Sequence, residues 1–230
     1  MITTFGSCRV DGINGNNNLN NSISYLHNTK EMIQMIKILN KEIVLEEPYN
    51  ILCFRTGILN NKPINISDNY VKKFLNSKIV LLEICSIKKY IHNGYYLHHN
   101  SVVSATIERK PNPNTPKDIV ENFIVMEQNY NELEDDILQI KEMLEDKYLI
   151  IVTHYNSKLH GSFLKSRNML ITNLEHICKK YNIVCINPTN ILKKFNQDDI
   201  ITNDLGHYTS KGKTEIIKYI DEFIKSNISN

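Results

Sequence analysis

Several features that would place a protein in a class at once are missing from this sequence. No apolar run approaches the length of a membrane span, and the chain does not open with a basic segment followed by an apolar one. The formal net charge is only +2 over 230 residues, and lysine and arginine are spread among the acidic residues. This charge distribution gives no electrostatic case for nucleic-acid binding. We expect a soluble, cytoplasmic protein that binds neither a membrane nor nucleic acid.

Paired cysteines of the redox or metal-binding kind are also missing. The chain has five cysteines, an odd number, and no CxxC pair. Four of the five lie in apolar segments, as ordinary buried thiols do. A reducing compartment is therefore expected. No internal repeat and no long linker divides the chain, so we predict one domain over residues 1–230.

The apolar residues, 41% of the chain, are arranged as in an α/β protein. Five short runs are continuously apolar, which is typical of parallel strands covered on both faces; they are 2–6, 49–54, 78–84, 148–153 and 182–186. Helical periodicity fills the gaps at 29–39, 116–145, 162–180 and 209–225. This alternation predicts a doubly wound, flavodoxin-like, five-stranded parallel sheet flanked by helices.

One segment interrupts that alternation. Asn93-Gly94 lies between two aromatic-rich arms, which is a strong β-hairpin signal. A loop rich in proline and asparagine follows, from Lys110 to Pro116. We interpret 88–115 as an insertion near the active edge, either a lid or a surface hairpin without a role.

Polar residues follow the predicted strands where a doubly wound sheet binds its ligands, outside the carboxyl ends. They are Gly6, Ser7, Cys8 and Arg9 after the first strand, Arg55, Thr56 and Gly57 after the second, Cys85 and Ser86 after the third, His154, Tyr155 and Asn156 after the fourth, and Asn187, then Asp204 and His207, after the fifth.

Cys8 and His207 form the most informative pair in this set. A thiol attacks an acyl carbonyl only as its thiolate, and a nearby imidazole can remove the proton. Asp204 stands three residues before His207 and could hold the imidazole in the required tautomer. Ser7 is the rival nucleophile; otherwise its hydroxyl caps the following turn. The Cys8 amide is a candidate donor to the oxyanion.

The first and last of these motifs resemble the SGNH (GDSL-type) hydrolase superfamily, which opens with strand–Gly-Asp-Ser and closes with Asp-x-x-His. Phe5-Gly-Ser-Cys8 and Asp204-x-x-His207 stand in these places. The resemblance implies that Cys8 is the nucleophile and that the N–H of Gly57 serves the oxyanion hole. The third-block Gly-x-Asn is absent, since residues 83–86 read Glu-Ile-Cys-Ser, and this argues against a simple esterase.

The Gly-Ser-Cys form is similar to cysteine-bearing branches of the superfamily. One is the Gly-Ser-Cys-Phe-Ala family, and another is a capsule-polysaccharide biosynthesis family with Gly-Asn-Cys-Gln, associated with coenzyme A binding and acetyl transfer to sugars. Arg9 departs from both patterns. The resemblance implies acetyl-CoA as acyl donor and co-substrate and a carbohydrate as acceptor.

Other polar residues are candidates for binding the substrate or co-substrate. Arg9, Lys30 and Arg55 could hold phosphates or a carboxylate, or could simply be solvated. His27 stands just before a helix N-terminus that could receive an anion. His154 and Asn156 enter the predicted crevice, where His154 either contacts substrate or is structural. His98 and His99 are adjacent in a predicted strand and should point to opposite faces, so we predict no metal site.

Three functions remain open. The first is an acyltransferase that moves an acetyl group from acetyl-CoA to a sugar or aminosugar in polysaccharide biosynthesis. The second is an SGNH-type esterase or deacetylase that acts on acylated carbohydrate. The third is a catalytically inactive ligand-binding module. The sequence does not indicate an oligomeric state.

Overall fold

Four of the five apolar runs form the central sheet of the computed structural model, which describes residues 1–13, 23–102 and 112–228. The strands are β1 (Ile2–Phe5), β2 (Ile79–Ile84), β6 (Tyr148–Thr153) and β9 (Val184–Ile186). They are all parallel, in the order β1-β2-β6-β9. Every residue of β2 is buried, which explains why all of them except Glu83 are apolar. All four carboxyl ends therefore meet at one edge.

The fifth run, 49–54, is not a strand, and the predicted five-stranded sheet is corrected to four. Tyr49–Leu52 forms helix α2, and Arg55–Asn60 forms α3. The Pro48 carbonyl accepts from the amides of Ile51 and Leu52, so this short segment turns as a helix. Leu52 and its apolar neighbours are still buried in the core. A short apolar run fits a buried helical turn as well as a strand, and periodicity alone cannot separate the two.

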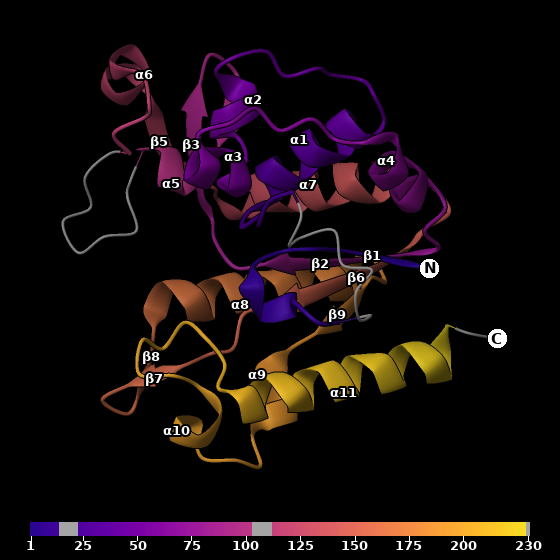
Figure 1. Cartoon of the computed structure of the whole chain (residues 1–230). Coiled ribbons are helices and arrows are strands. Elements are labelled where there is room, and N and C mark those ends of the chain that lie inside the picture. The colour runs from indigo at the N-terminus through magenta and orange to yellow at the C-terminus, as the bar shows by residue number, and fades with distance from the viewer. Residues whose placement is uncertain (14–22, 103–111, 229–230) are drawn as a thin grey trace.

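Helices cover both faces of the sheet, which confirms the α/β class (Figure 1). Alternate residues of β2 point to opposite faces: Val80 and Leu82 enter one apolar cluster, and Ile79 and Leu81 enter the other. The first cluster includes residues of α1 (Thr29–Leu39), α4 (Asp68–Leu75), α7 (Tyr130–Met143) and α8 (Lys165–Lys180). The second includes residues of α9 (Pro188–Leu192), α10 (Gln197–Ile200) and α11 (Ser210–Asn227).

Helix α1 coincides with its prediction, and α8 and α11 differ from theirs by at most three residues at either end. The single helix predicted over 116–145 is wrong. It is divided into α6 (Lys117–Asn122), strand β5 (Ile124–Glu127) and α7. The helical segment ends where β5 pairs with β3 (Lys88–His92). Helix α7 begins after Asn129, whose side chain accepts a hydrogen bond from the Glu132 amide.

The predicted hairpin is confirmed. Strands β3 (Lys88–His92) and β4 (Tyr95–Leu97) are antiparallel, and Asn93 and Gly94 both take positive φ, 48° and 81°, in the turn between them. Strand β5 adds to the other side of β3, and the short helix α5 (His99–Val102) follows β4. This small sheet lies beside α3 and α5 at the upper left of Figure 1. The later part of the predicted insertion, 103–111, lies outside the described residues.

Two short elements complete the description, a 3-10 turn η1 (Cys8–Val10) and a two-stranded ribbon of β7 (Lys158–Leu159) and β8 (Ser162–Phe163). Among the residues that the structure describes, none of the helices combines the length and the apolar character needed to cross a membrane.

Candidate active site

A cavity of about 650 Å³ lies at the carboxyl edge of the sheet. The loops after β1, β2 and β6 line it, and so does the loop that precedes α11. The small sheet and α5 close another side with Lys88, Tyr90 and His99. The described part of the predicted insertion 88–115 therefore borders this cavity. Within the described residues, the side chains that matter most for chemistry here are Ser7, Cys8, Arg9, His27, Arg55, Cys85, His154, Arg167 and His207.

The loop after β1 is packed against a buried carboxylate. Gly6 has φ of 149°, and a Cβ at this position would lie 2.6 Å from the Cβ of Glu83, so only glycine fits. The Ser7 amide donates to Glu83 Oε2 at 2.8 Å, and the Ser7 hydroxyl donates to the same oxygen at 2.5 Å. The hydroxyl also accepts from the Arg9 amide at 3.2 Å, which caps η1. Ser7 is only 3% exposed, so its hydroxyl serves the loop.

Cys8 differs from Ser7 in its exposure. It is half-buried and lines the cavity. Burial raises the pKa of the Cys8 thiol above its ordinary value, and the Arg9 guanidinium offsets only part of this effect. The thiol is therefore protonated at neutral pH. A base must remove its proton before the sulfur can attack.

Glu83 and Arg9 form a buried ion pair beneath this loop. Arg9 Nε donates to Glu83 Oε1 at 2.5 Å, and the two side chains are 9% and 1% exposed. Burial alone would raise the pKa of Glu83. The positive charge of Arg9, with the hydrogen bonds from Ser7 and Arg9, outweighs burial and holds the pKa below its ordinary value. Arg9 Nη1 also donates to the carbonyl of Gly206 at 2.8 Å.

The loop that holds His207 is organised by Asp204. Asp204 Oδ2 lies 2.6 Å from His207 Nδ1. Its other oxygen, Oδ1, accepts from the amides of Gly206 (2.7 Å) and His207 (3.0 Å) and from the hydroxyl of Thr202 (2.7 Å). Partial burial would raise the pKa of Asp204, but these hydrogen bonds outweigh it and hold the pKa well below the usual range. An ionised Asp204 keeps the proton of a neutral ring on Nδ1, which leaves Nε2 as a base.

The two distant ends of the chain meet at this edge. Cys8 and His207 line the same cavity, and both also line a smaller hollow of about 200 Å³ beside it. His207 and Asp204 are each about half exposed, with 54% of the side chain accessible. The arrangement combines a thiol, a base and an orienting carboxylate, which are the parts needed for nucleophilic acyl chemistry.

The other predicted residues divide into two groups. His27, Arg55 and His154 line the cavity, with Arg55 5.0 Å above the Tyr25 ring. Burial, with the nearby cations of Arg9 and Arg167, lowers the pKa of His154 to about 3, so this ring is neutral.

Lys30, Asn156 and Gly57 are not among the lining residues of the described chain. Lys30 pairs with Asp136 of α7 at 2.7 Å, and Asn156 donates to Asn168 at 2.7 Å, so both have structural partners. Gly57 lies inside α3, because the strand expected before it is a helix. A Cβ at Gly57 would lie 2.5 Å from the Ile51 carbonyl, and this close approach accounts for the glycine.

Two functional residues were missed by the sequence interpretation. Glu83 was noted only as a departure from a family motif, although a carboxylate inside a fully buried strand indicates a buried partner. Arg167 of α8 donates to the Leu205 carbonyl at 2.5 Å and to the Ser157 hydroxyl at 2.8 Å. Arg167 lies in an ordinary amphipathic helix, so the local sequence did not predict these contacts.

The prediction that His98 and His99 point to opposite faces is wrong. The strand ends at Leu97, and His99 begins α5, so the two residues are not in extended backbone. Their ring centroids lie 4.4 Å apart.

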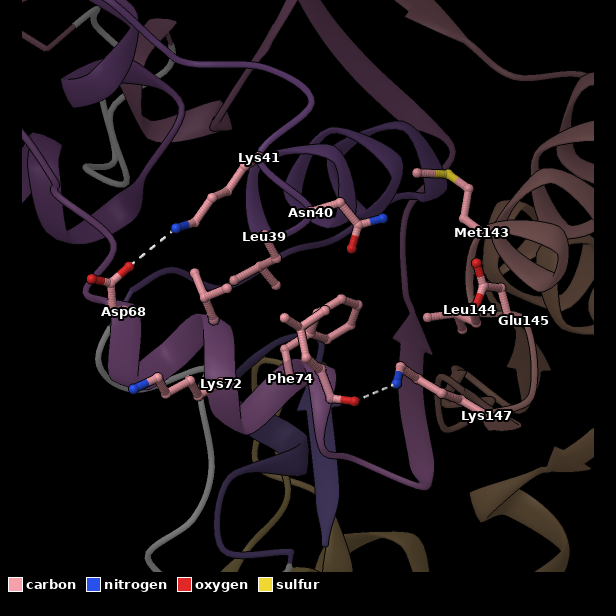
Figure 2. Close-up of a pocket in the computed structure, with 12 residues that line it drawn as sticks. Leu39, Asn40, Lys41, Asp68, Lys72, Phe74, Met143, Leu144, Glu145 and Lys147 are labelled. Carbon is pink, nitrogen blue, oxygen red and sulfur yellow. Dashed lines mark hydrogen bonds and ion pairs between the residues drawn. The ribbon is translucent and has the colours of Figure 1, made fainter.

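A larger hollow, about 810 Å³, lies at the opposite edge, near the amino ends of β2 and β6. Leu39, Phe74 and Met143 line it. Figure 2 shows that Lys41 and Lys147, at its rim, already have partners. Lys41 reaches Asp68 at 3.2 Å, and Lys147 donates to the Leu75 carbonyl at 2.8 Å. No cysteine or histidine is among the described residues that line this hollow.

Comparison with known proteins adds a family. The model of the TviD N-terminal domain matches residues 1–116 and 102–222, which together span nearly the whole chain. The chain belongs to this family. It is also 23% identical, over its full length, to the Vi polysaccharide biosynthesis protein TviD of Salmonella typhi. The chain spans about a third (32%) of that protein's length. The TviD N-terminal domain match includes both the Cys8 loop and the Asp204–His207 loop.

Proposed function

We propose that this chain is an SGNH-like acyltransferase that moves an acetyl group from acetyl-CoA to a sugar or aminosugar in polysaccharide biosynthesis. The observation that supports this most is the shared cavity of Cys8 and the Asp204–His207 pair. The biosynthetic setting is proposed from the relative, which is named for Vi polysaccharide biosynthesis. The donor and the acceptor are proposed from the resemblance of the Gly-Ser-Cys motif to acetyl-transferring families.

The proposed reaction has two halves. His207 Nε2 removes the proton from Cys8 Sγ, and the thiolate attacks the carbonyl carbon of the acetyl thioester. The tetrahedral intermediate collapses, the coenzyme A sulfur leaves with the proton from His207, and an acetyl thioester remains on Cys8. In the second half, His207 removes a proton from the acceptor hydroxyl or amine, whose attack releases the Cys8 thiolate. That thiolate takes back the proton from His207.

Cys8 is a better nucleophile than Ser7 in this arrangement. The Ser7 hydroxyl already donates to Glu83 Oε2, so its proton is held by a buried carboxylate. Cys8 and His207 both line the smaller hollow, and Ser7 is not among the described residues that line it. The Cys8 amide, in the first turn of η1, is the proposed donor to the oxyanion.

The cavity lining also suits an anionic donor. Arg55, Lys88 and Arg167 lie among the lining residues, whereas Glu31 is the one carboxylate among those described. Coenzyme A carries phosphates, which guanidinium and ammonium groups bind through charge-assisted hydrogen bonds. We propose that Arg55 contacts this part of the donor.

Hydrolysis is the second candidate, and the exposure of His207 favours it. A base that is 54% exposed can reach water as well as a sugar. The same residues would then release acetate from an acetylated carbohydrate, and the chain would be an esterase or deacetylase.

Intact-mass spectrometry after mixing the protein with acetyl-CoA tests the proposal. We expect a mass increase of one acetyl group, mapped to Cys8, which disappears when an aminosugar acceptor is added. Cys8→Ala should abolish it. Cys85→Ala is the matched control, because Cys85 lines the same cavity and burial raises its pKa to about 12. Hydrolysis of the acetyl adduct in the absence of a sugar would indicate the hydrolase. A wild-type protein that neither takes up acetyl nor releases coenzyme A with any sugar would contradict acetyl transfer, and one that also releases no acetate from acetylated sugars would be left as a binding module.

A further inference from the structure

Three histidines from separate segments converge at one side of the cavity. His27 precedes α1, His98 follows β4, and His99 begins α5. The ring centroid of His27 lies 5.2 Å from that of His98 and 4.8 Å from that of His99. One nitrogen from each ring lies within 4.8 Å of the other two. The backbone of His27 is held in place because its carbonyl accepts from the amides of Cys85 and Ser86.

Two nitrogens of this cluster are buried without a hydrogen-bond partner among the described residues. They are His27 Nδ1 and His98 Nε2. The nearest carboxylate to the first is Glu31 Oε2, at 3.6 Å, which is beyond a hydrogen bond. Buried polar atoms are almost always satisfied in folded proteins, so two unpaired nitrogens in one cluster point to a missing ligand.

One cation and one carboxylate lie beside the cluster. The positive charge of Arg55 disfavours a metal cation at the cluster. The negative charge of the buried Glu31 carboxylate beside His27 offsets this repulsion.

We propose that His27, His98 and His99 form a binding site for one divalent transition-metal ion of the zinc type. Three imidazoles with further positions open are the donor set of many zinc sites, and imidazole also suits nickel, cobalt and copper. Ligand nitrogens of a tetrahedral zinc ion lie about 3.3 Å apart, so the rings must close by side-chain rotation.

Binding requires one change of tautomer. His98 Nδ1 accepts from the Asn100 amide at 3.2 Å, so the proton of the neutral ring lies on Nε2. A metal ion at Nε2 displaces that proton to Nδ1, and the long contact with Asn100 is lost. His27 and His99 line the main cavity, so the remaining metal positions face the same space as Cys8. A water or a substrate oxygen would occupy them.

Metal binding can be measured directly, without any activity. The full chain, dialysed against a chelator, is titrated with Co²⁺ and followed by its visible absorption, and Zn²⁺ affinity is obtained by competition. We expect one equivalent to bind, and His27→Ala and His99→Ala to weaken binding by more than about 10-fold. His176→Ala and His207→Ala are controls outside the cluster and should bind as the wild type does. Cys8→Ser, whose Co²⁺ spectrum should match the wild type, excludes thiolate ligation.

Folding of each variant is checked by its melting temperature without metal, and Zn²⁺ should raise that temperature in the wild type but not in His99→Ala. The proposal is overturned if the wild type binds no stoichiometric metal ion. It is equally overturned if folded His27→Ala and His99→Ala bind like the wild type, or if His207→Ala is the variant that loses binding. Because the test measures binding alone, its outcome is independent of the acetyl-transfer experiment.

Discussion

Arg9 and Gly206 are joined by a hydrogen bond of 2.8 Å from the guanidinium Nη1 to the backbone carbonyl. The same guanidinium pairs through Nε with the buried carboxylate of Glu83. One side chain thus connects the loop of Cys8, the centre of the sheet and the loop of His207. Arg167 holds the next carbonyl, that of Leu205, from the side of α8. Arg9 therefore holds the His207 loop against the Cys8 loop, and Arg167 holds the same His207 loop against the Ser157 segment.

Replacing Arg9 should separate these loops and destabilise the fold. In Arg9→Met the Glu83 carboxylate is buried without its cation, and removing one partner of a buried pair costs about 3–5 kcal/mol. We expect a loss of this size in the free energy of unfolding, measured in urea. Glu83→Gln combined with Arg9→Met should recover part of the loss, because the double variant buries no charge. A single variant within about 0.5 kcal/mol of the wild type would contradict the structural role of Arg9.

Ser7 and Cys8 should respond in opposite ways to substitution by alanine. Ser7→Ala removes a hydrogen bond to the buried Glu83, so we expect a loss of about 1–3 kcal/mol in stability with acetyl uptake retained. Cys8→Ala should leave stability nearly unchanged and abolish acetyl uptake. Urea unfolding and intact-mass spectrometry on both variants measure the two effects. Acetyl uptake that is lost in Ser7→Ala and kept in Cys8→Ala would assign the nucleophile to Ser7.

The parts of the fold that were predictable are those with strong local patterns. The four strands of the sheet are mainly apolar runs, Thr29–Leu39 has a helical period, and Asn93-Gly94 supplies the backbone of a tight turn. The run 49–54 failed because a short, mainly apolar segment fits a buried helical turn equally well. The helix over 116–145 failed because β5 forms only by pairing with β3, a contact that local periodicity does not contain.

Of the candidate site, the sequence predicted only that Cys8, Asp204 and His207 come together. Cys8, Asp204 and His207 follow from the place of reactive side chains after strands, and the fold brings them to one edge. The residues that hold the loops together depend on distances across the fold. Glu83 and Arg9 are 74 positions apart, and no local pattern connects them. The three-histidine cluster was missed because His98 and His99 were assigned to a strand that ends one residue earlier.

His154 should contribute to the dependence of stability on pH. Its folded-state pKa is about 3, below the ordinary value of 6.5, so the unfolded chain takes up a proton that the folded chain refuses. The stabilisation is complete above about pH 6.5 and is lost as the pH falls towards 3, with a slope of up to about 1.4 kcal/mol per pH unit. In His154→Gln the slope should be smaller, because the proton that His154 takes up on unfolding no longer contributes to it.

Urea unfolding at a series of pH values between 4 and 7 measures this slope, within the window set by the two pKa values. His176→Gln is the matched control. His176 is exposed and lies beside Tyr130, so its loss should leave the slope as in the wild type. If the free energy of unfolding depends on pH equally in the wild type and in His154→Gln, then His154 has the same pKa in the folded and unfolded chains.

Asp204→Asn tests the orientation of the base separately from the stability of its loop. The amide oxygen of asparagine can still accept from the Gly206 and His207 amides, so the loop should keep its shape. When the asparagine oxygen keeps these bonds, its NH2 group faces His207 Nδ1. That group can only donate a hydrogen bond, whereas the carboxylate oxygen of Asp204 accepts one. The ring then loses the tautomer in which Nε2 is the base, and we expect the rate of acetyl transfer to fall about 10²–10⁴-fold. Because Asp204 is half exposed, the melting temperature should change little.

The measurement is single-turnover acetylation of Cys8, with Asp199→Asn as a control for loss of a neighbouring exposed carboxylate. An unchanged rate in a folded Asp204→Asn would mean that His207 does not act as the base in the orientation that Asp204 imposes.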